Sequence, residues 1–233
     1  MKPSHLGRLF DILKDMKLLL TPEGIRNQTI ADALVELLGK PISESNILFI
    51  PTPANLRTDD KSWIVENMNQ FLRHNPLSFN IADIAGMPIE QAVEHFTAAD
   101  VICVGGGDDS YISEVLRVQG LVNPLRDALQ SRIFMGISAG SMLVGTPLPP
   151  NVNKMLYPDE PFLHEQAQTL GWCDITFVPH LGSEECPEVR VEILESLRKG
   201  LPVNTVAVSD QGAIVINGDD VSVVGEGEIW QYQ

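Results

Sequence analysis

Short apolar runs alternate with segments of helical periodicity through the first part of this chain. Apolar runs of this length are typical of strands buried on both sides, and they predict strands over residues 17–21, 46–50, 77–84, 100–104 and 133–137. Between them the apolar residues recur at helical spacing, which predicts helices over residues 27–38, 58–74, 89–98, 110–118 and 124–130. Strands separated by helices in this order predict an α/β fold: a mostly parallel sheet with helices on both faces.

The pattern changes after the last of these strands. Residues 146–161 carry many prolines and little periodicity, which predicts a loop. Two further strands are expected at 173–179 and 205–209, with a helix over 187–199 between them. Residues 212–233 are expected to form a C-terminal β-hairpin meander with a turn at Asn217-Gly218.

No long linker interrupts this pattern, so we expect one domain over residues 1–233. Residues 1–15 are expected to be an N-terminal amphipathic helical extension, because apolar and charged residues alternate there at helical spacing. Segment 4–14 of this extension is expected to pack either on its own domain or on a second subunit, as in a homodimer.

The pentapeptide Gly136-Ile137-Ser138-Ala139-Gly140 ends the apolar strand 133–137 and begins a segment of small and apolar residues. A Gly-x-Ser-x-Gly sequence between a strand and a helix is typical of a nucleophile elbow, a sharp turn that exposes a strained serine. The two glycines let strand and helix approach closely. We therefore predict Ser138 as a nucleophile, and an ordinary glycine-rich turn is the alternative.

A serine hydroxyl needs a base to take its proton and an acid to orient that base. His180 directly follows the predicted strand 173–179, and in a parallel sheet it would emerge at the same edge as Ser138. Asp210 follows the predicted strand 205–209 in the same way and is the expected acid. Aspartate before a turn is also ordinary turn chemistry, so other acids remain alternatives. They are Asp159, Asp174, Glu184 and Glu185.

Three consecutive glycines, residues 105–107, follow the predicted strand 100–104. They lack the spacing of the glycine-rich phosphate-binding loops, so a phosphate site is the weaker interpretation. We expect the backbone amides of Gly106 or Gly107, together with the amide of Ala139, to form an oxyanion hole.

Composition narrows the partners. The formal charge of −15 opposes binding to nucleic acid and to anionic lipid, because both depend on Lys and Arg. No apolar run approaches the roughly 20 residues that span a bilayer, and the N-terminus does not resemble a signal peptide, so we expect a cytoplasmic protein. The three cysteines form no Cys-x-x-Cys pair, which argues against a disulfide framework or a zinc site. We expect no metal and no cofactor.

Taken together, these motifs resemble the family of serine peptidases that contains peptidase E, an α-aspartyl dipeptidase, and cyanophycinase. The resemblance rests on Gly105-Gly106-Gly107, the pentapeptide at 136–140 and Pro179-His180, in that order, and it covers about residues 17–216. It implies a class I glutamine-amidotransferase-like (flavodoxin-like) fold and hydrolysis of small peptides, dipeptides with N-terminal Asp among them. It also implies Ser138 as the nucleophile, His180 as the base, and the amides of Gly106 or Gly107 with Ala139 as the oxyanion hole.

The chain departs from this family at three positions. Asp108 stands after the triple glycine where peptidase E has Asn, which is closer to cyanophycinase. Lys154 replaces the Asp that has been assigned to the peptidase E triad, and Asp210 matches the position of the family's other candidate acid, a Glu. Pro187 replaces an Arg suited to a substrate carboxylate, and only Arg190, one turn on, is retained.

These departures leave the substrate contacts as expectations. We expect Asp108 to contact the substrate, and Arg190 or Lys154 to receive a substrate carboxylate. The alternatives are a non-catalytic ligand-binding or regulatory homologue and a cyanophycinase-like hydrolase.

Overall fold

The fold is seen in a computed structural model that describes residues 16–160 and 168–232. The predicted amphipathic segment 4–14 lies outside these residues, and so does the expectation that it packs on its own domain or on a second subunit. No helix in the described part of the chain is long and apolar enough to cross a membrane.

The larger sheet has seven strands in the order β3-β2-β4-β5-β1-β8-β9. Strands β3, β2, β4, β5 and β1 are parallel, and β8 pairs antiparallel with both β1 and β9. Their bounds are β1 (Lys17–Thr21), β2 (Asn46–Ile50), β3 (Ser78–Ile81), β4 (Val101–Val104), β5 (Ile133–Ile137), β8 (Gly212–Asn217) and β9 (Asp220–Gly225). The mostly parallel sheet that the sequence predicts is thereby confirmed, and β8 with β9 forms the expected hairpin.

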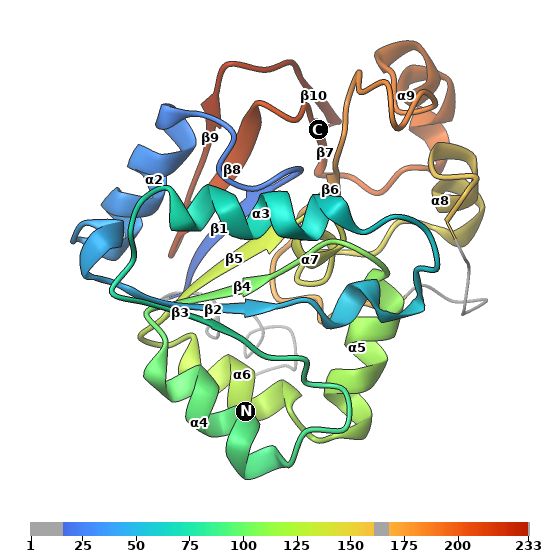
Figure 1. Cartoon of the computed structure of the whole chain (residues 1–233). Helices are drawn as coiled ribbons and strands as arrows, with labels where there is room; N and C mark the ends of the chain where they lie inside the picture. The colour runs from blue at the N-terminus through green and yellow to red at the C-terminus, as the bar shows by residue number, and fades with distance from the viewer. Residues whose placement is uncertain (1–15, 161–167, 233) are drawn as a thin grey trace, which may run out of the picture.

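Helices cover both faces of this sheet (Figure 1). One face carries α4 (Ile89–Ala98), α5 (Asp109–Val118) and α6 (Val122–Ala128), and the other carries α2 (Gln28–Leu38) and α3 (Ser62–Leu72). The strand side chains alternate between these layers: Leu18 and Leu20 of β1 pack into the core that α4 to α6 cover, whereas Leu19 packs into the core below α2 and α3. A strand buried on both faces has no reason to show a polar side, which explains the unbroken apolar runs.

Asn27 and Gly39 set the ends of α2. The Asn27 side chain accepts a hydrogen bond from the backbone N–H of Ile30 at 3.0 Å, as a helix N-cap does. Gly39 ends the helix with a left-handed φ of 68°, a conformation that glycine adopts without a steric penalty.

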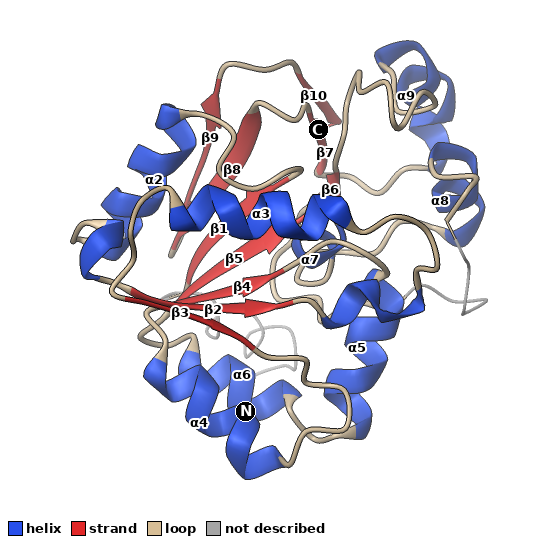
Figure 2. Ribbon diagram, viewed as in Figure 1, coloured by secondary structure: helices blue, strands red, loops and turns tan. Residues whose placement is uncertain are grey.

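A second, smaller sheet holds three strands in the order β10-β7-β6 (Figure 2). These are β6 (Thr176–Val178), β7 (Thr205–Val208) and β10 (Ile229–Tyr232), with β6 and β7 parallel and β10 antiparallel to β7. They pack with α8 (Pro150–Leu156) and α9 (Val191–Leu197) around a separate cluster of buried side chains.

Three predictions from the sequence are wrong in this part of the chain. Residues 146–161 were expected to be a loop, but they contain α8, in which Pro150 occupies the first turn, where a missing N–H costs nothing. The expected meander over 212–233 ends at β9, because β10 leaves the hairpin and pairs with β7. The expected helix 187–199 begins only at Val191, and it is followed by a single 3-10 turn over Arg198–Gly200.

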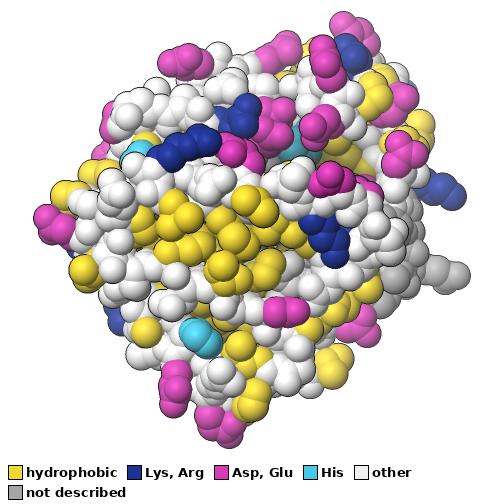
Figure 3. Space-filling view, viewed as in Figure 1, with side chains coloured by type: hydrophobic (Ala, Val, Ile, Leu, Met, Phe, Trp, Pro, Cys, Tyr) yellow, Lys and Arg dark blue, Asp and Glu magenta, His cyan; other side chains and the backbone are white. Residues whose placement is uncertain are grey.

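The face over α3 and β3 exposes apolar side chains (Figure 3). Val65 and Leu72 of α3 are exposed, and so are Leu77, just before β3, and Ile81, which ends it. Asp and Glu side chains gather instead to the upper right of this apolar patch, around a histidine.

Candidate active site

Ser138 occupies a sharp turn between β5 and the short helix α7 (Ala139–Met142). Its backbone has φ 52° and ψ −114°, a strained conformation for a residue with a side chain. The neighbouring glycines permit the turn: a Cβ on Gly140 would lie 2.0 Å from the carbonyl oxygen of Val104, and one on Gly136 would lie 2.5 Å from the Cα of Ser141. The backbone N–H of Ser138 donates to the carbonyl oxygen of Thr21 at 2.9 Å, which ties the turn to β1.

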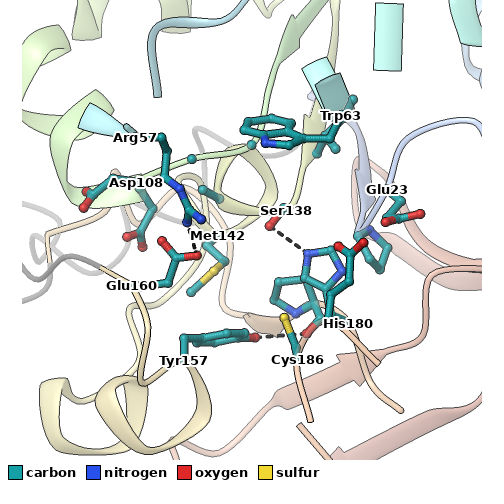
Figure 4. A pocket seen from close by; sticks show the side chains of 18 of the residues that line it. Glu23, Arg57, Trp63, Asp108, Ser138, Met142, Tyr157, Glu160, His180 and Cys186 are labelled. Atoms are coloured by element: carbon teal, nitrogen blue, oxygen red, sulfur yellow. Dashed lines mark hydrogen bonds and ion pairs between the residues drawn. The ribbon is translucent and has the colours of Figure 1, made fainter. Parts of the chain in front are cut away.

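The side chains of Ser138, His180 and Asp210 form a continuous hydrogen-bonded chain. His180 Nε2 lies 3.0 Å from Ser138 Oγ, and His180 Nδ1 lies 2.8 Å from Asp210 Oδ1. Figure 4 shows the first of these contacts from within the pocket. An ionised carboxylate only accepts hydrogen bonds, so Nδ1 carries the proton that Asp210 binds and Nε2 is left to accept from the serine hydroxyl.

The charge on Asp210 is maintained by its neighbours. Burial works against ionisation, but the hydrogen bond and the charge of His180, together with a hydrogen bond from Ser183, outweigh it and hold the pKa of Asp210 below its ordinary value. The carboxylate is therefore ionised at neutral pH.

His180 and Asp210 each follow a strand of the smaller sheet, not of the larger one. His180 comes after β6 with a φ of 69°, and Asp210 comes after β7. The sequence predicts a single sheet edge for all three residues, and this detail is wrong: the edges of two sheets meet at the site. The backbone N–H of Leu181 donates to the carbonyl oxygen of Val208 at 3.1 Å, which holds the two strand ends together.

Tyr157 binds the backbone directly before His180. Its hydroxyl donates to the carbonyl oxygen of Pro179 at 3.0 Å, and burial raises the pKa of this phenol well above its ordinary value. The proton therefore stays on the hydroxyl and the hydrogen bond persists. The residue before His180 is held in place by this contact, which no motif in the sequence indicates.

The triple glycine passes beside Ser138. A Cβ on Gly106 would lie 3.6 Å from the Cβ of Ser138 and 3.3 Å from the ring of Trp63. Gly107 has a φ of 133°, and a Cβ there would lie 2.2 Å from the carbonyl oxygen of Pro53, so only glycine fits. The backbone N–H of Asp108 donates to that same carbonyl oxygen at 2.9 Å, which fixes the loop.

A pocket of about 310 Å³ opens over Ser138, His180 and these glycines. Ala139 and Met142 of α7 line it, as do Trp63 of α3 and Tyr157. Its charged side chains are mostly acidic. The acidic ones are Glu23, Asp59, Asp108, Asp109, Glu160 and Glu185.

Arg57 is the one Lys or Arg side chain that lines this pocket among the residues the structure describes. It is already paired: its Nε and one terminal nitrogen contact the two oxygens of Asp59 at 2.9 and 2.6 Å, and its other terminal nitrogen contacts Glu160 at 2.5 Å. These partners raise the pKa of Arg57, and the hydrogen bond from Arg57 lowers the pKa of Asp59 to about 2.

Three further groups in the pocket have shifted pKa values. Burial, with the charge of Asp108 beside it, raises the pKa of Asp109 to about 7. Burial and the nearby charge of Asp210 raise the pKa of Glu23. Burial, with several nearby carboxylates, raises the pKa of the Cys186 thiol to about 12, so Cys186 is a neutral thiol and a poor nucleophile.

The structure does not bring all of the predicted substrate residues to the pocket. Lys154 and Arg190 are exposed and do not line it, and Arg190 Nε donates to the carbonyl oxygen of Pro187 at 2.7 Å. Asp108 does line it, but Asp108 Oδ1 accepts from the backbone N–H of Tyr111 at 2.6 Å and caps α5. The expectation that Lys154 or Arg190 lies at the substrate site does not agree with the structure, because neither side chain lines the pocket, whereas Arg57 does.

One group of side chains in the described ranges has the geometry to hold a metal ion. Glu23, His180 and Asp210 each offer one ligand atom, and these atoms lie within 4.8 Å of one another. His180 and Asp210 already bind each other there, so an ion would have to displace their hydrogen bond.

Comparisons with known proteins agree with this fold. The model of peptidase family S51 matches residues 18–224. No curated protein matches the sequence. Two crystal structures share the fold: a candidate peptidase E from Listeria monocytogenes EGD-e has 17% sequence identity and a TM-score of 0.73, covering 91% of this chain and 98% of its own. A peptidase from an acI-B1 actinobacterium has 20% identity and a TM-score of 0.66, covering 94% of this chain and 95% of its own.

The family match extends over most of the chain and includes Ser138, His180 and Asp210. It confirms the resemblance on which the sequence interpretation rests. The chain belongs to peptidase family S51.

Proposed function

We propose that this chain is a serine-type peptidase that hydrolyses small peptides, with dipeptides that begin with Asp as the substrates implied by its resemblance to peptidase E. The observation that carries the proposal is the hydrogen-bonded chain from Ser138 through His180 to Asp210 at the base of a pocket. Membership of a peptidase family supports it independently.

In the proposed reaction Ser138 Oγ attacks the carbonyl carbon of the scissile peptide bond while His180 Nε2 takes the hydroxyl proton. Asp210 stabilises the imidazolium that forms and holds its ring orientation. His180 then gives the proton to the departing amine, and the acyl group stays on Ser138. A water molecule, deprotonated by His180, releases the acid and restores the hydroxyl.

The negative charge on the tetrahedral intermediate needs donors that are already in place. We assign them to the backbone N–H groups of Gly106 or Gly107 and of Ala139, each worth about 3 kcal/mol of transition-state stabilisation. Gly106 lies against Ser138 and its loop is fixed by Pro53, whereas Ala139 directly follows the nucleophile. Both residues line the pocket.

Preference for Asp is the more demanding part of the proposal. Arg57 is the guanidinium that a substrate carboxylate would meet in this pocket, and Asp59 and Glu160 already bind it. We expect a substrate carboxylate to replace Glu160, which makes one contact with Arg57, and not Asp59, which makes two. Comparison of the peptides Asp-Leu and Asn-Leu, which differ only in this charge, measures the preference directly.

Ser138→Ala tests the mechanism. Purified protein is assayed against a panel of dipeptides that includes both peptides, and it is labelled with a fluorophosphonate probe at neutral pH. We expect Ser138→Ala to abolish both turnover and labelling, and Ser110→Ala, which removes another serine that lines the pocket, to retain them. Turnover that survives Ser138→Ala would refute the mechanism, and an unlabelled wild-type protein would favour the non-catalytic alternative.

A further inference from the structure

Glu23 lies in a loop that buried polar side chains hold in one conformation. Thr21 Oγ1 accepts from the backbone N–H of Gly24 at 2.9 Å. Gln70 Oε1 accepts from the N–H of Ile25 at 2.6 Å, and Gln70 Nε2 donates to the carbonyl oxygen of Glu23 at 3.0 Å. Thr21 is fully buried and Gln70 is 3% exposed. These three hydrogen bonds bind the backbone from the carbonyl of Glu23 to the N–H of Ile25, and buried polar contacts of this kind fix the course of the chain that carries the Glu23 side chain.

The Glu23 side chain lies beside His180 and Asp210. Glu23 lines the pocket, and one of its carboxylate oxygens lies within 4.8 Å of a ring nitrogen of His180 and of an oxygen of Asp210. In Figure 4 it lies on the opposite side of His180 from Arg57 and Asp108. No step of the proposed hydrolysis uses this carboxylate.

The distances fit the amino group of a bound peptide. The α-nitrogen of a residue lies about 2.5 Å from its carbonyl carbon, as backbone geometry requires. A charge-assisted hydrogen bond spans a further ~2.8 Å. A carboxylate about 5 Å from the carbonyl carbon that Ser138 attacks can therefore bind the α-ammonium. Glu23 is the carboxylate beside His180, whose Nε2 lies 3.0 Å from Ser138 Oγ.

The charges of the pocket also favour a bound cation, such as the α-ammonium group of a peptide. Six carboxyl side chains line it against Arg57, and Arg57 is paired with two of them. Glu23 has a partner of its own in Arg26 at 3.2 Å, but Arg26 is the more exposed of the two and does not line the pocket. A cation between Glu23 and Asp210 would relieve their repulsion, whereas an anion there would increase it.

We propose that Glu23 receives the free α-ammonium group of the substrate and so selects peptides whose first residue carries the scissile carbonyl. This inference rests on the proposed function, because it places the substrate on Ser138. Glu23 is then a specificity-determining residue: it contacts the substrate and takes no part in the transfer of the proton.

The test compares Glu23→Gln with wild type on two substrates that differ only in the amino group: Asp-Leu and its desamino analogue, succinyl-leucine. We expect wild type to prefer Asp-Leu in kcat/KM, and Glu23→Gln to lower kcat/KM for Asp-Leu by roughly 30-fold, the value of a charged hydrogen bond. Turnover of succinyl-leucine should change by less than about threefold, since that substrate has no group for Glu23 to bind. Glu185→Gln, which removes the same charge from the same pocket, is the matched control and should leave the preference intact.

Equal losses on the two substrates would overturn the proposal, because they would show that Glu23 acts on His180 or Asp210. Equal effects of Glu23→Gln and Glu185→Gln would overturn it too, because they would show that the substrate responds to the total negative charge of the pocket and not to Glu23 in particular. Calorimetric binding of both compounds to Ser138→Ala, with and without Glu23→Gln, separates this inference from the proposed function. If wild type hydrolyses no dipeptide of the panel, the proposed function fails. A binding preference of Ser138→Ala for Asp-Leu that Glu23→Gln removes would still support the role of Glu23. Without that preference, the role of Glu23 is refuted.

Discussion

Replacement of Asp210 by asparagine tests the most specific geometric feature of the site. Asp210 Oδ1 lies 2.8 Å from His180 Nδ1, and this contact keeps the proton on Nδ1 while Nε2 lies 3.0 Å from Ser138 Oγ. An amide NH₂ turned toward His180 would favour the other tautomer, in which Nε2 carries the proton and cannot accept one from Ser138. In serine peptidases of the same geometry this change lowers kcat by about 10⁴, or about 5.5 kcal/mol in activation free energy. We expect a loss of that order.

The assay measures kcat on the best peptide of the panel, the rate of fluorophosphonate labelling of Ser138, and thermal unfolding. Asp174→Asn is the matched control: Asp174 precedes β6 and accepts from Asn204 Nδ2 at 3.0 Å, but it does not line the pocket. We expect this control to stay within about twofold of wild type, as exposed substitutions usually do.

Stability gives a second readout of the same contact. The pKa of Asp210 is lowered in the folded protein, so its ionised form stabilises the fold above the ordinary pKa of aspartate. This contribution is lost as the pH falls through the lowered value, and Asp210→Asn should lack it. The reasoning would be refuted by a folded Asp210→Asn protein that labels within about tenfold of the wild-type rate. Glu23, within 4.8 Å of the same atoms, would then be the acid to examine.

Two further substitutions test the pocket and the turn. The pKa of Asp109 is raised from 3.8 to about 7, which corresponds to about 4 kcal/mol at full burial and to about 2 kcal/mol for this partly exposed group. A raised carboxyl pKa destabilises the fold as the pH rises, so Asp109→Asn should have a higher free energy of unfolding in urea than wild type at pH 8. The gain should be clearly smaller at pH 5.5. An equal gain at both pH values would contradict the raised pKa of Asp109. Gly140→Ala should lose about 3 kcal/mol of stability and most labelling of Ser138, because its Cβ would lie 2.0 Å from Val104 O, whereas Gly200→Ala, with 3.7 Å to Val152, should be near wild type.

The larger sheet could be predicted because its strands are buried on both faces. Leu18, Leu19 and Leu20 pack alternately into two cores, so β1 appears in the sequence as an uninterrupted apolar run. The turn at Ser138 could be predicted for a related reason: contacts as close as those of Gly136 and Gly140 exclude every side chain, and glycine at both positions indicates the close packing directly.

The smaller sheet could not be predicted in the same way. Its strands have only three or four residues, and β10 leaves a local hairpin to pair with β7, some 20 residues earlier in the chain. Pairing of this kind depends on contacts between segments that are distant in the sequence, and no local pattern of residues indicates it.

The pocket side chains show the same limit. Arg57 and Glu160 lie in loops that are far apart in the sequence, and their 2.5 Å contact exists only in the folded chain. Lys154 and Arg190 have the right chemistry and lie near the right motifs, but the backbone directs both away from the pocket. The residue type can be predicted from a motif, whereas the direction of a side chain at the surface depends on how its loop or helix is placed by tertiary contacts.

The site lies between two sheets, so the distances among its three side chains depend on how the two sheets pack against each other. Ser138 follows a strand of the larger sheet, while His180 and Asp210 follow strands of the smaller one. The chain just beyond the turn fastens them together: the backbone N–H of Thr146 donates to the carbonyl oxygen of Ile175 at 2.9 Å, and Met142 packs against the cores of both sheets. A hydrogen bond of 3.0 Å between Ser138 and His180 leaves little room for one sheet to shift against the other. The apolar contacts of Met142 therefore contribute to the alignment of the nucleophile with its base, although the Met142 side chain has no part in the proton transfer.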